Sequence, residues 1–488
     1  MSALTHDEQR EHLEAISQMG SFGRAEGEDE SRFPLSYCPI PEHLRAFDPD
    51  VVLVVGPRGA GKTELFKAGI ELGLLPAIGR LFPKLRLPPA EKTTFVKAFP
   101  LGREFPDGRG LKQFVANERA GDALVDLWFA YLVRTLAKNL DQTGLEALLR
   151  PAGGDPAAVL QGFRACGQRP LLALDDLDAK LERENGYLFV GYDELDTFGQ
   201  GDWHTVNQAV QGLVALWSSM ARRWRRIRAK LFLRTDLYDR AGVRSGADFA
   251  KLAANRADIT WSDGSLYAML IKRIANASDD LLAYCSAKVR FDRDDTLGHI
   301  PEIRNAADAR PLVERMIGPY MGANANKGLT FRWLLDHVRD GRGHALPRAL
   351  VRLLEQSAEM QKKSGKLPRS PRLIEPGALR RALDRVSEEH VNQAGSEWPW
   401  IEGLKERLKK DREVPWGRRD VERVLAKNWD EPWGSQGDVT PPAESPRDLV
   451  DYLIEVGVFR DRTGGRIDVP GLFLFGLDLK RRGGVGRA

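Results

Sequence analysis

The chain is poor in the residues that build disulfide frameworks and metal centres. It has only three cysteines, Cys38, Cys166 and Cys285, and their wide spacing fits neither a disulfide framework nor a metal site. The eight histidines form no HxxxH or HxH pair, so no histidine metal cluster is predicted. We therefore expect the cysteines to be small buried apolar side chains in a reducing compartment.

Long apolar runs and a strong charge of one sign are also missing. No stretch approaches the roughly 18–20 uncharged apolar residues that a membrane span requires. Residues 1–18 lack the basic start and apolar run of a signal peptide, so we expect a cytoplasmic protein with no membrane contact. The 73 basic and 69 acidic residues leave a net charge of +4, which gives no bulk argument for nucleic-acid binding.

What the sequence does contain is an alternation of short apolar runs with longer helical patterns. The apolar runs lie at 51–55, 93–98, 171–174, 187–192, 229–233 and 259–261. The helical patterns lie at 62–74, 118–140, 204–223 and 265–276. This order predicts an α/β fold with a parallel sheet. A further helix is expected at 6–19.

A glycine-rich turn follows the first of these apolar runs. Residues 56–63 read GPRGAGKT, which fits the phosphate-binding pattern GxxxxGK[ST] between a buried strand and a helix. The glycines allow positive φ and let backbone N–H groups surround phosphate oxygens, and the helix directs its positive end at the anion. Lys62 is expected to reach the β- and γ-phosphates, and the Thr63 hydroxyl to bind Mg²⁺. The predicted ATP-binding residues are Gly56, Pro57, Arg58, Gly59, Ala60, Gly61, Lys62, Thr63 and Glu64.

Such a loop needs an acidic partner at the end of another strand, and two segments compete for this role. Asp175 and Asp176 follow the run at 171–174 but supply no glutamate. Asp193 and Glu194 follow the longer run YLFVGY and supply an aspartate for Mg²⁺ and a glutamate for the attacking water. We favour Asp193 and Glu194, and interpret Asp175 as a helix N-cap.

Two places supply polar side chains that could sense the γ-phosphate. Arg234, Thr235 and Asp236 follow the run at 229–233, where they are either sensors or a solvated strand end. Arg348 begins an amphipathic helix, where it is either a second sensor that couples hydrolysis to domain rotation or a surface arginine. The basic run at 222–226 is either an inter-subunit arginine finger or, as we favour, a solvated helix end.

The rest of the chain is predicted to be mostly helical. No convincing strand occurs at 278–361, and 362–376 is a connector. Near the end, a capped helix, a short strand, a Gly-Gly turn and an alternating strand (RIDVPGLFLFGL) indicate a winged helix-turn-helix module. We predict four parts: an N-terminal helix and nucleotide-flanking segment at 1–50, a P-loop ATPase core at 51–277, a helical lid domain at 278–365, and a C-terminal helical and winged-helix-like domain at 366–488.

The order of these motifs resembles a known family. The P-loop, DELD, the strand ending LRTDLY, the LPRAL helix and the terminal winged-helix pattern follow one another as in the STAND/Orc-like branch of the AAA+ superclass. The similarity is greatest to bacterial P-loop ATPases of defence loci and extends from about Phe22 to Leu479. Smaller similarities are SFGRAEGEDE before the P-loop, Lys251 and Trp261 after the sensor strand, and the terminal VPGLFLFGL.

The resemblance implies roles for individual residues. Asp193 would serve Mg²⁺, Glu194 would activate water, Arg234 or Asp236 would act as the first sensor, and Arg348 as the second. It also implies a nucleotide-controlled switch, often oligomeric.

Several partners are therefore expected. The resemblance implies a homo-oligomer that acts in anti-phage defence. Because no nuclease, TIR, protease or repeat sensor motif is visible, we expect the effector or sensor that it controls to be a separate protein. The alternative is a DNA-binding ATPase of the origin-loading or transposition-targeting type. The basic tail at 480–487 favours this alternative, but the predicted recognition segment Asp448–Gly457 is acidic and apolar, so DNA is not favoured. A metabolic kinase is the least favoured reading.

Overall fold

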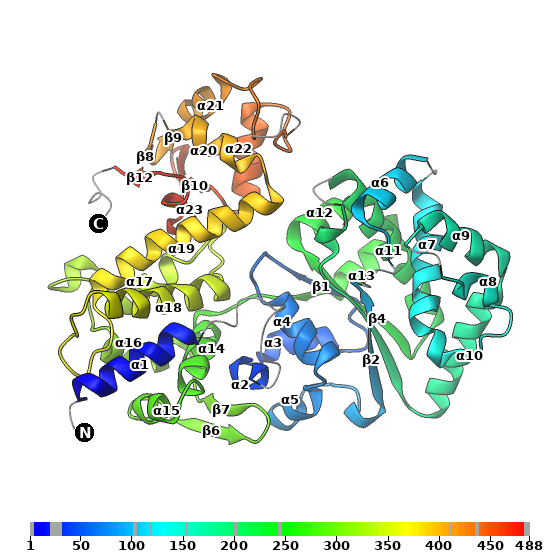
Figure 1. The fold of residues 1–488 in the computed structure, drawn as a ribbon, viewed down its shortest axis with the longest axis horizontal. Helices are drawn as coiled ribbons and strands as arrows, with labels where there is room; N and C mark the ends of the chain where they lie inside the picture. The colour runs from blue at the N-terminus through cyan, green and yellow to red at the C-terminus, as the bar shows by residue number, and fades with distance from the viewer. Residues whose placement is uncertain are drawn as a thin grey trace. The chain divides into compact units, whose positions relative to one another are not determined.

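The chain folds into two compact units in the computed structural model. We call Pro39–Thr260 the sheet unit, and Met1–Cys38 together with Trp261–Ala488 the helical unit (Figure 1). This division differs from the predicted one, because the N-terminal helix and the helix at 263–275 both belong to the helical unit. The structure describes residues 4–19, 32–100, 105–117, 120–151, 154–199, 203–242, 246–409, 411–434 and 439–482.

The sheet unit is built on a five-stranded sheet in the order β2-β3-β4-β1-β5. Every neighbouring pair of strands is parallel. The strands are β1 (Leu53–Gly56), β2 (Thr93–Phe99), β3 (Tyr187–Tyr192), β4 (Ile227–Arg234) and β5 (Ala257–Asp258). Most of their apolar residues are buried because helices cover both faces, as a parallel sheet requires, although Phe95 and Val96 of the edge strand β2 are half-buried. The predicted α/β class with a parallel central sheet is confirmed.

Helices of the sheet unit pack on opposite faces of this sheet, with α4 on one and α7 on the other (Figure 1). The helices and helical turns are α3 (Pro41–Leu44), η2 (Arg45–Phe47), α4 (Lys62–Phe66), η3 (Lys67–Glu71), α5 (Leu75–Leu81), η4 (Ala90–Lys92), α6 (Gly108–Asn117), α7 (Ala120–Leu136), η6 (Ala137–Asn139), α8 (Glu146–Leu149), α9 (Pro156–Ala165), α10 (Arg169–Arg183), η7 (Leu195–Gly199), α11 (Trp203–Arg223), α12 (Thr235–Gly242) and α13 (Gly246–Ala254). A Cβ at Gly191 of β3 would lie 2.7 Å from the Phe66 ring, so this glycine lets α4 approach the sheet closely.

The apolar run at 171–174, which precedes the competing acidic segment, does not form a strand. Residues 171–174 lie inside α10, because Leu174 and Leu177 recur at helical spacing and are buried together. Asp175 is in the middle of this helix rather than at its N-cap, and it accepts a hydrogen bond from Arg223 Nε at 2.7 Å. Asp178 accepts from the backbone N–H of Ile227 at 2.8 Å. These acidic residues therefore hold the start of β4, at the end of the sheet opposite the P-loop.

Up to residue 397, the helical unit combines packed helices with a small hairpin. Its helices up to residue 397 are α1 (His6–Gln18), α2 (Phe33–Ser36), α14 (Asp263–Ala275), α15 (Asp279–Ser286), α16 (Ala306–Met316), η8 (Ala325–Lys327), α17 (Thr330–Asp336), α18 (Pro347–Lys363) and α19 (Pro376–Glu397). The hairpin of β6 (Phe291–Asp294) and β7 (Gly298–Pro301) contradicts the prediction of no strands at 278–361. Its strands are short and mostly polar, so they lack the apolar run that identifies a strand in sequence.

The C-terminal part of the helical unit combines helices with short strands. The elements are α20 (Ile401–Leu408), β8 (Glu413–Val414), β9 (Trp416–Gly417), α21 (Arg418–Ala426), α22 (Pro446–Glu455), β10 (Arg460–Arg462), β11 (Arg466–Asp468), α23 (Gly471–Leu474) and β12 (Lys480–Arg481). A three-stranded sheet has the order β10-β11-β9, and β12 pairs with β8. The alternating strand predicted to continue past residue 468 is wrong, because residues 471–474 form α23 and all four are buried.

Two further findings concern the chain as a whole. All three cysteines are buried and form no disulfide. None of the helices in the described ranges is long and apolar enough to cross a membrane.

Candidate nucleotide site

The loop from β1 to α4 has the backbone conformation that its glycines allow. Gly59 has φ 75° and Gly61, the N-cap of α4, has φ 92°, so both lie in the left-handed region that side chains disfavour. A Cβ at Gly56 would lie 3.0 Å from the Cβ of Ile259. The loop therefore places the N-terminus of α4 at the carboxyl end of β1, where parallel sheets bind ligands.

Lys62 is the first residue of α4 and bends back over this loop. Its side chain is 9% exposed, and Nζ donates to Gly56 O at 2.9 Å and to Pro57 O at 3.0 Å. Burial lowers the pKa of Lys62 to about 8, and the positive charge of Arg234 acts in the same direction. Asp193 raises this pKa in opposition, so Lys62 and Asp193 lie in one electrostatic cluster.

This lowered pKa predicts a pH dependence of nucleotide binding. Only protonated Lys62 attracts phosphate, so binding is full below about pH 8 and is lost as the pH rises through this value. We expect the Kd for ATP, measured by titration calorimetry with Mg²⁺, to rise roughly tenfold between about pH 7 and about pH 9. Lys62→Arg is the control, because a guanidinium stays charged and its Kd should vary little over this range. A flat profile in the wild type would contradict the role of Lys62.

Asp193 directly follows β3, and its side chain lies against the P-loop helix. It is 4% exposed, and its carboxylate interacts with the side chain of Thr63 of α4. Burial raises the pKa of Asp193, whereas the interaction with Thr63 lowers it. Its Oδ2 atom is buried and has no hydrogen-bond partner in the described part of the chain. A buried oxygen of this kind beside a threonine hydroxyl fits a hard cation such as Mg²⁺.

Glu194 has an unusual backbone conformation. Its φ of 54° is left-handed, which costs a non-glycine residue about 1–3 kcal/mol. The Glu194 carbonyl accepts from Thr197 N at 3.0 Å and from Thr197 Oγ1 at 2.8 Å, which holds the turn after β3 in this conformation. Strained residues of this kind occur often at active sites.

Arg234 ends β4 and is held by two carboxylates. Nε and Nη2 each donate to Asp236 at 3.0 Å, and Nη1 donates to Asp196 at 3.0 Å. The Arg234 side chain is only 7% exposed. Arg234 and Asp236 were predicted from the sequence, whereas Asp196 was not, although it is the last residue of the DELD segment. Thr235 begins α12 beside them.

The remaining predicted site residues are divided between the two units. Arg58 and Glu64 belong to the P-loop segment of the sheet unit. Arg348 belongs to the helical unit, where it is exposed in the first turn of α18. Residues 21–30, which carry SFGRAEGEDE, and the end of the basic tail from residue 483 lie outside the described residues.

The basic run at 222–226 lies at the start of β4, at the opposite end of this strand from Arg234. Arg223 pairs with Asp175, and Arg225 Nη1 lies 3.5 Å from Glu182 Oε1. These pairs within the chain fit the favoured interpretation of a helix end better than an arginine finger.

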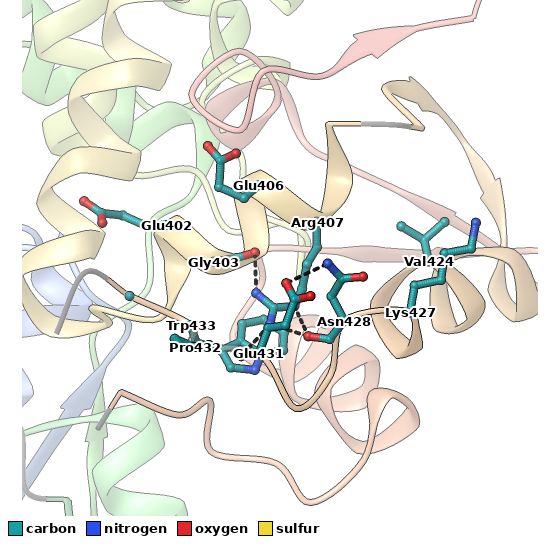
Figure 2. A pocket seen from close by; sticks show the side chains of 11 residues that line it. Glu402, Gly403, Glu406, Arg407, Val424, Lys427, Asn428, Glu431, Pro432 and Trp433 are labelled. Carbon is teal, nitrogen blue, oxygen red and sulfur yellow. Dashed lines mark hydrogen bonds between the residues drawn. The ribbon is translucent and has the colours of Figure 1, made fainter. Parts of the chain in front are cut away.

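The helical unit also contains a pocket of about 480 Å³ between α20 and the chain after α21 (Figure 2). Arg407 stacks on Trp433 with 3.7 Å from Cζ to the ring centroid. Its guanidinium donates to the carbonyl oxygens of Gly403, Asn428 and Glu431. Arg407 therefore braces the wall of the pocket, and none of the predicted site residues lines it.

Comparisons of the sequence with known proteins find no match. No protein-family model matches the sequence, and no curated protein matches it.

Similar solved structures include the ORC2 protein of Aeropyrum pernix in its ADPNP–ADP complexes. It is 14% identical over 93% of this chain and 92% of that chain, with a TM-score of 0.36. A Walker-type ATPase of Pyrococcus abyssi is 12% identical over 93% and 95%, with a TM-score of 0.37. The ADP form of the Aeropyrum pernix ORC2 protein is 13% identical over 91% and 88%, with a TM-score of 0.27. At these TM-scores the functional conclusion depends on the site itself.

Proposed function

We propose that this chain binds ATP with Mg²⁺ at the P-loop and hydrolyses it. The observation that carries the proposal is the Asp193 carboxylate directly after β3: it interacts with Thr63 of the P-loop helix, and its buried Oδ2 atom has no hydrogen-bond partner among the described residues. The phosphate-binding loop and the acidic residue after β3 are far apart in the sequence, and the pairing of the strands in the sheet brings them together. Lys62 lies in the same cluster and supplies the positive charge.

Each residue has a role that follows from its chemistry. Backbone N–H groups of the loop and Lys62 bind the phosphates. Thr63 and Asp193 hold Mg²⁺, which would neutralise phosphate charge. Among the residues that the structure describes, no group of three His, Cys, Asp or Glu side chains could hold a metal ion alone. This agrees with Mg²⁺, which takes one or two protein ligands and completes its shell with phosphate oxygens and water. Glu194 accepts the proton of the attacking water.

We further propose that hydrolysis serves a regulatory switch rather than the conversion of a metabolite. The resemblance to STAND/Orc-like ATPases of defence loci supports this role, as does the large helical unit joined to the site-bearing sheet unit. In this proposal the chain forms a homo-oligomer that controls a separate effector or sensor protein, and Arg348 acts as the second sensor.

DNA binding is less well supported. The elements α20, β9, α21, α22, β10 and β11 follow the order of a winged helix, in which α22 would be the recognition helix. The exposed residues of α22 include Asp448 and Glu455, which repel phosphate, and Asp451, which pairs with Arg418. In the basic strand β12, Arg481 already pairs with Asp468. We therefore favour a protein partner for this region.

Mass photometry tests the switch. We expect the mass distribution to differ between ATP, ADP and no nucleotide, because ATP binding would change the oligomeric state. The ATP-dependent species should be absent in Lys62→Ala. Identical distributions in all three conditions, with nucleotide binding shown separately, would leave an ATPase but remove the proposed oligomeric switch.

A further inference from the structure

We propose that Asp196 is a positioning residue that competes with the γ-phosphate of ATP for Arg234. When ATP binds, Arg234 exchanges Asp196 for the terminal phosphate, and the released Asp196 lets the turn that carries Glu194 move. ADP lacks this phosphate and leaves the pair intact. This inference rests on the proposed ATPase function and explains how the site would distinguish ATP from ADP.

Of the two carboxylates that bind Arg234, Asp196 makes fewer hydrogen bonds and is therefore the one that the phosphate would replace. Asp236 holds Arg234 through two parallel hydrogen bonds at 3.0 Å, from Nε and Nη2, and lies only two residues away. Asp196 holds it through one bond, from Nη1, across 38 residues of sequence. Paired bonds fix a guanidinium more strongly than one bond. Arg234 can therefore keep Asp236 while Nη1 turns to another anion.

Asp196 also lies close to Glu194 in the chain, so its release from Arg234 would affect the backbone around Glu194. It belongs to η7, which begins one residue after Glu194. The next residue, Thr197, donates to the Glu194 carbonyl from both its N–H and its hydroxyl. A movement of Asp196 therefore acts on the turn that sets the left-handed backbone of Glu194.

The charges of the site favour an exchange. Lys62 interacts electrostatically with Asp193, Asp196 and Asp236. Arg234 pairs with Asp196 and Asp236, and the cluster is mostly buried. A triphosphate adds further negative charge to this cluster, so the carboxylates and the phosphates compete for the same two cations. Asp196 is 23% exposed, which allows it to regain water when it loses Arg234.

Nucleotide affinities test the exchange. We expect Asp196→Asn to bind ATP about tenfold more tightly than the wild type, because the competitor has lost its charge. Its affinity for ADP should stay within about twofold of the wild type, since ADP does not engage Arg234. Combining Asp196→Asn with Arg234→Met should remove the gain in ATP affinity. Asp175→Asn is the matched control, because Asp175 also pairs with an arginine of this unit and is 28% exposed, but at the other end of β4.

Hydrogen exchange gives a readout other than affinity. The Thr197 amide should exchange differently with a non-hydrolysable ATP analogue than with ADP, and Asp196→Asn without nucleotide should already resemble the ATP-bound wild type. Equal changes in ATP and ADP affinity, or a gain that persists in the Arg234→Met background, would overturn the role of Asp196. A wild type that binds neither nucleotide would instead refute the proposed ATPase.

Discussion

Replacing Lys62 by alanine should abolish nucleotide binding while leaving the chain folded. Nζ donates to the carbonyl oxygens of Gly56 and Pro57, and bound phosphate would offer it stronger, charged acceptors. A hydrogen bond to a charged group contributes about 1.5–3 kcal/mol. Losing two such bonds should weaken ATP binding by about 10²–10⁴-fold. Titration calorimetry with Mg²⁺ and ATP measures this loss.

Two further variants separate the charge of Lys62 from its packing. Lys62→Met keeps an unbranched side chain in the buried position but has no charge, so it should lose binding as Lys62→Ala does. Lys180→Ala removes an exposed lysine from α10 and should bind ATP like the wild type. Thermal unfolding checks that each variant is folded. Wild-type ATPase activity in folded Lys62→Ala would refute the assignment of the P-loop.

Local patterns in the sequence predicted much of the sheet unit. The run before Gly56, the glycines at 59 and 61, and the helix from Lys62 form a continuous motif whose backbone conformation follows from residue type. The segment Tyr187–Tyr192 was also predicted as a strand, because six consecutive residues of apolar character indicate a strand buried on both faces. Such features need no knowledge of distant contacts.

Features that depend on distant partners were not predicted. The apolar residues of α10 are compatible with either a short buried strand or a helix. The helix is stabilised by its packing and by the backbone N–H groups at the start of β4, which donate hydrogen bonds to Asp178. The contact between Asp196 and Arg234 was not predicted because the two residues are 38 positions apart and meet only once β3 and β4 pair. The hairpin at 291–301 was missed because its strands have no apolar pattern.

Replacing Glu194 by glutamine should stop hydrolysis without preventing ATP binding. Glutamine keeps the size of the side chain and tolerates the same left-handed backbone, but an amide cannot accept the proton of the attacking water. We expect the turnover number to fall by about 10²–10⁴-fold, while the Kd for ATP stays within about threefold of the wild type. Phosphate release under steady-state conditions, together with calorimetric titration, measures both quantities.

The competing acidic segment supplies the control that decides this assignment. Asp176 is exposed on α10 and lies in a helix that packs near the start of β4, so Asp176→Asn should hydrolyse ATP at the wild-type rate. Asp175→Asn should lower thermal stability through the loss of the pair with Arg223, but it should turn over normally once folded. Because Glu194→Gln binds ATP and cannot hydrolyse it, this variant should also accumulate the ATP-dependent oligomer in mass photometry. If both α10 variants lose turnover while Glu194→Gln retains it, the catalytic acid is not at the end of β3.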